Sequence, residues 1–279
     1  MIEIAVRVAV DQAGVLVAPV GLSSPAGRCL DVTVDGARQE VLEEATLGQR
    51  VLVLTPTAEA VTLRYAYDAV PAAYPEPMFV PHRSRYIDPT PALASEAREI
   101  VAARGVAGFV DHVTRLFEYG HTVEKFYEGA EAIPQLCDMV TGSCVDINTY
   151  LVSGLRAAGV AAGYVTGYFI PAEKRTSTTD MHCWVATRVD GVVAHWDIAH
   201  HLKMGTRNVA PGLNPKPGVR LALSHSMGWT VPSLGVEDVK LLTEPMWHSG
   251  DGWARAALDI SLTGYDLLDA AQNAAALAD

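Results

Sequence analysis

The chain has 279 residues, of which 49% are apolar and 19% are charged, and its formal net charge is −11. This composition can bury a sizeable core and excludes an intrinsically disordered chain. The acidic balance, without a run of lysine or arginine, excludes a nucleic-acid partner, because phosphates require clustered basic side chains. We therefore expect one large globular domain or two modest ones.

Targeting signals are not evident in the sequence. Residues 1–7 lack the basic start and the long apolar core of a signal peptide, and no segment is long enough and apolar enough to span a bilayer. No two of the four cysteines have C-x-x-C spacing. These features predict a cytoplasmic chain with reduced thiols and no membrane partner, with a cleaved presequence absent from this sequence as the alternative.

The first part of the chain, residues 1–75, is expected to form a β-rich N-terminal domain. Apolar and polar residues alternate, or apolar residues run together, in the segments 2–8, 51–54 and 61–65. Turns rich in Gly, Pro and Asp separate them, which favours a small antiparallel sandwich or half-barrel. The proline-rich segment 71–77 suits neither a helix nor a central strand and predicts a boundary, so that a second domain covers 76–279.

Helices are predicted next, over 91–119 and, most clearly, over 143–159. Ser143 can cap the second helix, and Asp146 three places later completes a Ser-x-x-Asp capping signature. Gly159 supplies a C-terminal stop. One apolar face of this helix is formed by Ile147, Leu151 and Leu155.

Strands are expected after this helix, and the tail 258–277 is expected to be an amphipathic helix or a docking arm. The predicted strands are 160–170, 183–189, 192–198 and 219–225. The Asp190-Gly191 dipeptide is a strong hairpin signal between the second and third of them.

The hairpin gives a geometric check on two side chains. If Asp190-Gly191 is a two-residue loop, Trp184 lies opposite Asp197 in the neighbouring strand. His182 shares the face of Trp184 because side chains alternate with period two, and Cys183 points to the other face. His182 and Asp197 are therefore predicted to be diagonal neighbours on one face of the sheet.

Cys144 falls in the first turn of the predicted helix, where unpaired N–H groups and the helix dipole favour a thiolate. Cys144, His182 and Asp197 follow one another as a nucleophile, its base and the group that orients the base. The alternatives are a buried structural thiol, a strand histidine with satisfied hydrogen bonds and a turn-forming aspartate. We interpret the other three cysteines as packing residues: Cys29, Cys137 and Cys183.

Over roughly residues 130–230 the chain resembles the transglutaminase-like superfamily, a circularly rearranged relative of the papain-type fold. The resemblance rests on Gly142-Ser143-Cys144-Val145-Asp146, Leu155-Arg156-Ala157-Ala158-Gly159-Val160, Gly167-Tyr168, His182-Cys183-Trp184 and Trp196-Asp197. It implies an α+β fold in which an N-terminal antiparallel β domain precedes a papain-like core. In that core the Cys-bearing helix packs on an antiparallel sheet. The bacterial members with this arrangement include a group described as cysteine proteases.

The sequence departs from the family pattern near the expected site. Cys183 stands where members usually have alanine, and the proline usual after the aspartate is missing after Asp197. The family's glycine-, arginine- and aspartate-rich tail is replaced by Ser226-Met227-Gly228-Trp229. We expect the loops on the substrate side to differ for these reasons.

Histidines are also numerous around the expected site. The competing interpretation is that they bind a metal ion, with His182, His195, His200 and His201 as the candidate ligands. Zinc needs three or four converging ligands, and adjacent residues such as His200 and His201 do not easily share one face. We therefore expect no metal and no cofactor.

Contacts with substrate are expected from Trp184, Tyr168 and His225, since Trp184 lies beside the predicted base. The backbone N–H of Cys144 is the first expected oxyanion donor. The sequence does not select the second donor among three upstream candidates, which are Tyr119, His121 and Gln135.

The predicted reaction is attack of a thiol on an amide, with hydrolysis of the resulting thioester as in a cysteine amidase or peptidase. One alternative is acyl transfer, either amide exchange of the transglutaminase type or small-molecule ester, amide or C–C chemistry. Another is a binding protein without turnover on the same fold. The expected partner is a peptide or a small-molecule amide or acyl substrate, and the sequence gives no oligomeric state.

Overall fold

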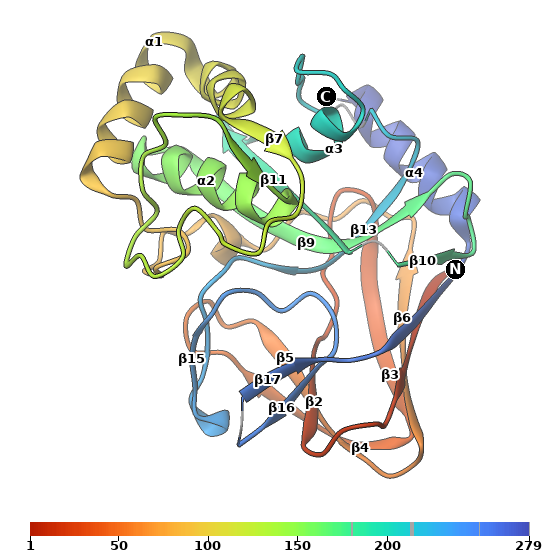
Figure 1. Cartoon of the computed structure of the whole chain (residues 1–279). Helices are drawn as coiled ribbons and strands as arrows, with labels where there is room; N and C mark the ends of the chain where they lie inside the picture. Colours follow the sequence, from red (N-terminus) through yellow and green to blue (C-terminus); the bar gives the residue numbers. More distant parts are fainter. Residues whose placement is uncertain (180, 213–214, 251, 279) are drawn as a thin grey trace.

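The computed structural model of the chain describes residues 1–179, 181–212, 215–250 and 252–278. It combines mostly antiparallel sheets with a few helices, which confirms the expected α+β class. Helices α1 and α2 and a four-stranded sheet form one part of the molecule, and two five-stranded sheets lie below them in Figure 1.

The four-stranded sheet carries the residues singled out by the sequence. Its strand order is β12-β11-β9-β13, and every neighbouring pair is antiparallel. The strands are β9 (Ala161–Pro171), β11 (Met181–Val189), β12 (Val192–Trp196) and β13 (Gly218–His225). The hairpin between β11 and β12 has the predicted register, with Val189 opposite Val192. Its turn needs positive φ at both central residues, and Asp190 and Gly191 adopt 51° and 82°.

Two helices cover one face of this sheet. Helix α2 (Cys144–Ala157) begins as predicted, because the Asp146 carboxylate accepts a hydrogen bond from the Ser143 backbone N–H at 2.9 Å. Helix α1 (Pro91–Leu116) is kinked at Gly105, where φ is 67°. The helices approach closely at Gly154, where a Cβ atom would lie 2.2 Å from the Phe109 ring.

The N-terminal strands form two sheets that strands from the C-terminal region complete. In the first sheet, with the order β10-β18-β1-β6-β3, β18 (Leu258–Thr263) pairs with residues 3–8 of β1 (Ile2–Ala9). In the second, with the order β17-β16-β2-β5-β4, β16 (Met246–Ser249) pairs with β2 (Val15–Pro19). The other members are β3 (Arg28–Asp35), β4 (Ala37–Glu43), β5 (Arg50–Pro56), β6 (Ala60–Asp68), β10 (Ser177–Thr178) and β17 (Gly252–Arg255).

This pairing bears on one expectation about domains and corrects one about the tail. The boundary at residue 75 stays a prediction, and β16 and β18, which follow it in the sequence, hydrogen-bond to strands of residues 1–75. The tail 258–277 is only partly helical, since Leu258–Thr263 is a strand and α4 begins at Tyr265. In that strand Ile260 and Leu262 are buried while Asp259 and Ser261 are exposed, a period of two that the helical interpretation overlooked.

The remaining elements are short, apart from the C-terminal helix α4. They are η1 (Glu76–Phe79), β7 (Phe117–Tyr119), β8 (Val140–Gly142), α3 (Ile198–Lys203), β14 (Trp229–Val231), η2 (Pro232–Leu234), β15 (Val236–Val239) and α4 (Tyr265–Ala278). The strands β7 and β8 are parallel, and β8 leads directly into α2. No helix in the described ranges has both the length and the apolar character needed to cross a membrane.

Strand β9 contributes to two hydrophobic cores. Tyr164 packs in the core shared with α1 and α2, whereas Tyr168, farther along the strand, packs in the core shared with the N-terminal sheets. This long, buried strand therefore joins the two parts of the molecule and fixes the position of the four-stranded sheet between them.

Candidate active site

Cys144 is the first residue of α2 and is only 5% exposed. The pKa of its thiol is held well below the ordinary value: contact with the Cys183 thiol is the largest cause, burial opposes it, and His182 and Lys203 reinforce it. The N-terminal position adds the helix dipole in the same direction. The local environment therefore favours a thiolate at Cys144.

His182 and Asp197 lie together as the hairpin register predicted. The Nε2 atom of His182 is 2.9 Å from Oδ2 of Asp197, and both side chains are almost fully buried. Strand β12 ends at Trp196, one residue before Asp197, so the expectation of a strand to residue 198 is corrected. Asp197 instead caps α3, because its Oδ1 accepts a hydrogen bond from the His200 backbone N–H at 3.0 Å.

The electrostatics of the pair support a charged imidazole. Burial works to lower the pKa of His182, but the Asp197 carboxylate and the Cys144 thiolate outweigh burial and raise it above the ordinary value. Burial likewise works to raise the pKa of Asp197, but His182 and Arg220 outweigh it and hold this pKa well below the ordinary value. Because Asp197 engages Nε2, Nδ1 is the ring nitrogen left for Cys144.

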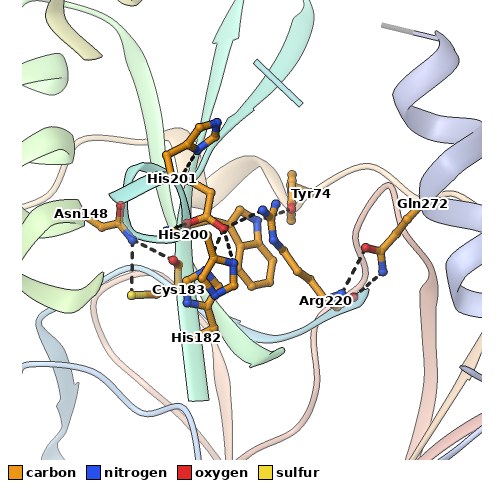
Figure 2. Close-up of polar contacts among 10 residues, drawn as sticks. Tyr74, Asn148, His182, Cys183, His200, His201, Arg220 and Gln272 are labelled. Carbon is orange, nitrogen blue, oxygen red and sulfur yellow. Dashed lines mark hydrogen bonds and ion pairs between the residues drawn. The ribbon is translucent and has the colours of Figure 1, made fainter. Parts of the chain in front are cut away.

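The Arg220 guanidinium and the His200 imidazole also contact Asp197 (Figure 2). Nη2 of Arg220 lies 2.6 Å from Oδ2 of Asp197, and Nδ1 of His200 lies 3.1 Å from the same oxygen. The rings of His182 and His200 are parallel and stacked, with centroids 3.7 Å apart. Asp197 is therefore the centre of a buried polar cluster and does not serve His182 alone.

This cluster also contains the one group of potential metal ligands found among the described residues. The ligand atoms of His182, Asp197 and His200 lie within 4.8 Å of one another. The Arg220 guanidinium, however, occupies the oxygen that a cation would need, which disfavours a second positive charge there. His201 points away, as expected for a residue adjacent to His200, and donates from Nδ1 to the Asp197 carbonyl at 2.7 Å. We interpret the cluster as a hydrogen-bonded network, and the absence of metal stays a prediction.

Comparison with known proteins identifies a family over part of the chain. A model of the transglutaminase-like superfamily matches residues 96–196, which include Cys144 and His182 and end one residue before Asp197. Residues 96–196 belong to the transglutaminase-like superfamily. No curated protein matches the chain by sequence.

Solved structures were also compared with the chain, and one of them shares its fold. The chain is 13% identical to a candidate cysteine protease from Cytophaga hutchinsonii, with a TM-score of 0.52 over 93% of this chain and 90% of the other. At this identity the likeness shows the fold alone. The periplasmic domain of TgpA from Pseudomonas aeruginosa is also 13% identical, with a TM-score of 0.36 over 75% of this chain and 93% of that domain.

The three residues predicted to contact substrate lie in different environments. Trp184 lies beside His182, with ring centroids 6.3 Å apart, and lines a cavity. Tyr168 is fully buried in the core shared with the N-terminal sheets, and His225 is buried with its Nδ1 3.0 Å from Oγ of Ser226. On β9, the ring that packs against His182 is that of Phe169, and the two ring centroids are 6.1 Å apart. Substrate contact by Tyr168 and His225 stays a prediction that their burial does not favour.

Phe169 could have been found from the sequence by the same period-two argument that placed His182. His182 pairs with Gly167 across β11 and β9, so Phe169, two residues later, shares that face. Arg220 pairs with Phe169 in the next strand, which extends the face by one step. No local pattern signals the Arg220–Asp197 contact itself, because a long connection separates β12 from β13 in the chain.

The remaining cysteines and the oxyanion candidates have distinct environments. Cys183 does more than fill the core, because Asn148 on α2 donates to its backbone carbonyl at 2.9 Å, and its thiol contacts that of Cys144.

Tyr119 lies in register with Gly142, two residues before Cys144, and its hydroxyl is 3.3 Å from Nε2 of His121. The assignment of a second oxyanion donor stays open between these groups and Gln135, which lies between β7 and β8.

Proposed function

We propose that this protein is a cysteine amidase or peptidase that acts through a thioester on Cys144. The observation that carries the proposal is the buried 2.9 Å contact between His182 and Asp197, with Cys144 near enough for the same imidazole to lower the pKa of its thiol. A thiolate, an imidazolium and a carboxylate in this order match the parts of a thiol-dependent acyl-transfer site. The transglutaminase-like core supports thiol chemistry in general.

In the proposed reaction, the Cys144 thiolate attacks the amide carbonyl carbon and a carbon–sulfur bond forms. The His182 imidazolium then gives its proton to the leaving nitrogen as the carbon–nitrogen bond breaks. Neutral His182 next takes a proton from water, which attacks the thioester and releases the acid. The thiolate and the imidazolium are restored at the end of this cycle.

The other groups would hold these reactants in place. Asp197 fixes the orientation of His182 and stabilises its charged form, and Arg220 and His200 fix the orientation of Asp197. The backbone N–H of Cys144, at the start of α2, would donate to the oxyanion that develops on the carbonyl. The developing negative charge would also lie at the positive end of the helix dipole.

Acyl transfer to an amine is the second candidate, and the burial of the site favours it. Cys144 is 5% exposed and His182 is 1% exposed, so little water reaches the thioester position in the unliganded protein. When water is excluded, an amine that binds next to the thioester can compete with hydrolysis. Both outcomes use the same three residues.

An activated ester tests the proposal without knowledge of the substrate. The protein should release one equivalent of 4-nitrophenolate from 4-nitrophenyl acetate in a burst, and mass spectrometry should find the acetyl group on Cys144. Cys144→Ala should abolish both signals, whereas Cys137→Ala, which removes an exposed thiol, should leave them unchanged. Acetylation elsewhere, with Cys144 unmodified, would refute the assignment.

The same acyl-enzyme discriminates the two reactions. Adding hydroxylamine should produce the hydroxamate in competition with acetate, and the ratio of products measures how well the site excludes water. Acetate as the main product over a wide range of hydroxylamine concentrations supports the amidase or peptidase. Hydroxamate as the main product supports the transferase.

The physiological substrate and location are also proposals. We expect a peptide or a small-molecule amide, handled in a reducing cytoplasmic compartment where the four free cysteines stay reduced. Cell fractionation with an antibody against the protein tests the location.

A further inference from the structure

A large cavity lies behind the proposed triad. Its volume is about 720 Å³, within the usual range for small-molecule pockets. The four-stranded sheet forms one wall, α4 forms another, and residues 24–26 with Tyr74 close the third side. Trp184 and Arg220, which line the cavity, share the sheet face of His182, but neither Cys144 nor His182 is among the described residues that line it.

The cavity has positive groups and a buried donor without a partner. Arg220 lines the cavity with 11% of its side chain exposed, and Nη2 of Arg220 binds Asp197. Its Nε atom is buried and has no hydrogen-bond partner among the described residues. Lys216 and Arg175 also line the cavity, and Arg175 pairs with Asp266 at 3.0 Å; among the described lining residues the one carboxylate is that of Asp269. A buried guanidinium donor without a partner is costly, and an anion would satisfy it.

The walls around Arg220 are flat and aromatic. Trp184, Tyr74 and Tyr265 line the cavity, and the Trp184 ring lies 5.6 Å from the Arg220 guanidinium carbon. Tyr74 joins two of the lining groups, because its hydroxyl accepts from Trp184 Nε1 at 3.3 Å and lies 3.2 Å from His195 Nε2. Burial and Arg220 lower the pKa of His195 to about 4, so this ring is neutral near pH 7 and provides hydrogen bonds without charge.

We propose that this cavity binds a small carboxylate with a flat aromatic body, whose carboxylate pairs with Arg220. The aromatic body stacks between the lining rings, and the carboxylate uses the free Nε edge of the guanidinium. The backbone of Arg220 is held in place by two hydrogen bonds to one side chain. Gln272 on α4 accepts from its N–H at 3.1 Å and donates to its carbonyl at 2.7 Å (Figure 2).

Binding in this cavity is coupled to the triad through a shared group. Arg220 would face the ligand with one edge while it holds the carboxylate oxygen of Asp197 with another. The ligand therefore competes with Asp197 for the guanidinium, and removal of the Asp197 charge should in turn strengthen ligand binding. This coupling rests on the proposed function, whereas the binding itself does not.

Calorimetry with a matched pair of probes tests the proposal on the full chain. We expect 2-naphthoate to bind at one site and 2-naphthamide, which has the same shape without the charge, to bind at least about tenfold more weakly. Ala172→Trp, which adds a large side chain at a lining position other than Arg220, and Arg220→Gln should each abolish binding. Arg64→Gln, which removes an exposed arginine from the N-terminal sheet, should leave binding unchanged. Asp197→Asn should bind 2-naphthoate more tightly.

The outcomes separate this inference from the proposed function. Equal binding of the acid and the amide, or unchanged binding in Ala172→Trp, overturns the proposed site. Unchanged affinity in Asp197→Asn overturns the coupling. Cys144→Ala should bind 2-naphthoate like the unmodified protein, so the binding result stands even if Cys144 proves not to be the nucleophile. Melting curves of each variant identify any that fail to fold, and the probe pair still tests the site in the unmodified protein.

Discussion

Arg220 Nη2 lies 2.6 Å from Oδ2 of Asp197, inside the protein and on a strand that does not neighbour the hairpin. The guanidinium holds the carboxylate in its charged form, and it stabilises that charge together with His182. An isolated buried carboxylate would be costly, so the cluster is stable only when its charges are paired. The orientation of the proposed base therefore depends on residues from β11, β13 and the start of α3.

The three triad variants should differ in severity. Cys144→Ala and His182→Ala should each lower kcat/KM by about 10⁶-fold, because each removes a group that takes part in bond making or proton transfer. Asp197→Asn should cost about 10⁴-fold, since His182 can still act, though less often in the correct tautomer.

Mutation of His195 or His200 to alanine should have the smallest effect of this series. The measurement is kcat/KM on any turnover substrate, with thermal melts to show that each variant is folded. A fully active Asp197→Asn together with an inactive His200→Ala would show that His200, and not Asp197, supports the base.

Alkylation by iodoacetamide should identify Cys144 at acidic pH. Because Cys183, His182 and Lys203 lower the pKa of Cys144, its thiolate should persist as the pH falls to about 6, where ordinary thiols are protonated. Burial raises the pKa of Cys29, and burial with the Cys144 charge raises that of Cys183, so both should react slowly. Peptide mapping after brief treatment measures the order, with the exposed Cys137 as the internal reference. Labelling of Cys137 before Cys144 at pH 6 would contradict the prediction.

Loss of Arg220 should shift the pH dependence of the reaction. The guanidinium lowers the pKa of Asp197, so this pKa should rise in Arg220→Gln. The carboxylate form supports the base, and it would then be lost at a higher pH as the solution is acidified. The acidic limb of the kcat/KM profile should therefore move to higher pH. Arg220→Lys should restore part of the original profile because it returns the charge, whereas a purely structural role would lower activity without moving the limb.

Chelators should leave the activity intact. If His182, Asp197 and His200 form a hydrogen-bonded network, overnight treatment with EDTA should not change kcat/KM, while iodoacetamide should abolish it. Elemental analysis of the purified protein provides the second readout. Stoichiometric zinc together with EDTA-sensitive activity would favour the metal interpretation of this cluster.

Local sequence patterns were sufficient for the elements that carry the triad. The capping signature at Ser143 and Asp146 predicted the start of α2, and therefore the environment of Cys144. The Asp190-Gly191 turn predicted the register of β11 and β12, and therefore the contact between His182 and Asp197. Both predictions succeeded because capping and hairpin turns depend on residues within a few positions of each other.

Contacts between distant segments were not predicted, and they account for the errors. The pairing of β18 with β1 joins residues 250 or more positions apart, so the local proline-rich segment could not reveal it. The apolar spacing of the whole tail is typical of a helix, although its first part alternates as a strand.

The sequence by itself determined which residues stand at the helix start and on the hairpin, because short-range backbone rules fix those positions. Only the tertiary structure decided what surrounds them. The packing of β13 beside β9 brings Arg220 to Asp197, and the docking of α4 against β13 through Gln272 encloses the cavity behind them. The physical reason is that burial and charge pairing depend on which segments meet in space, and this is settled by the whole core and not by neighbouring residues.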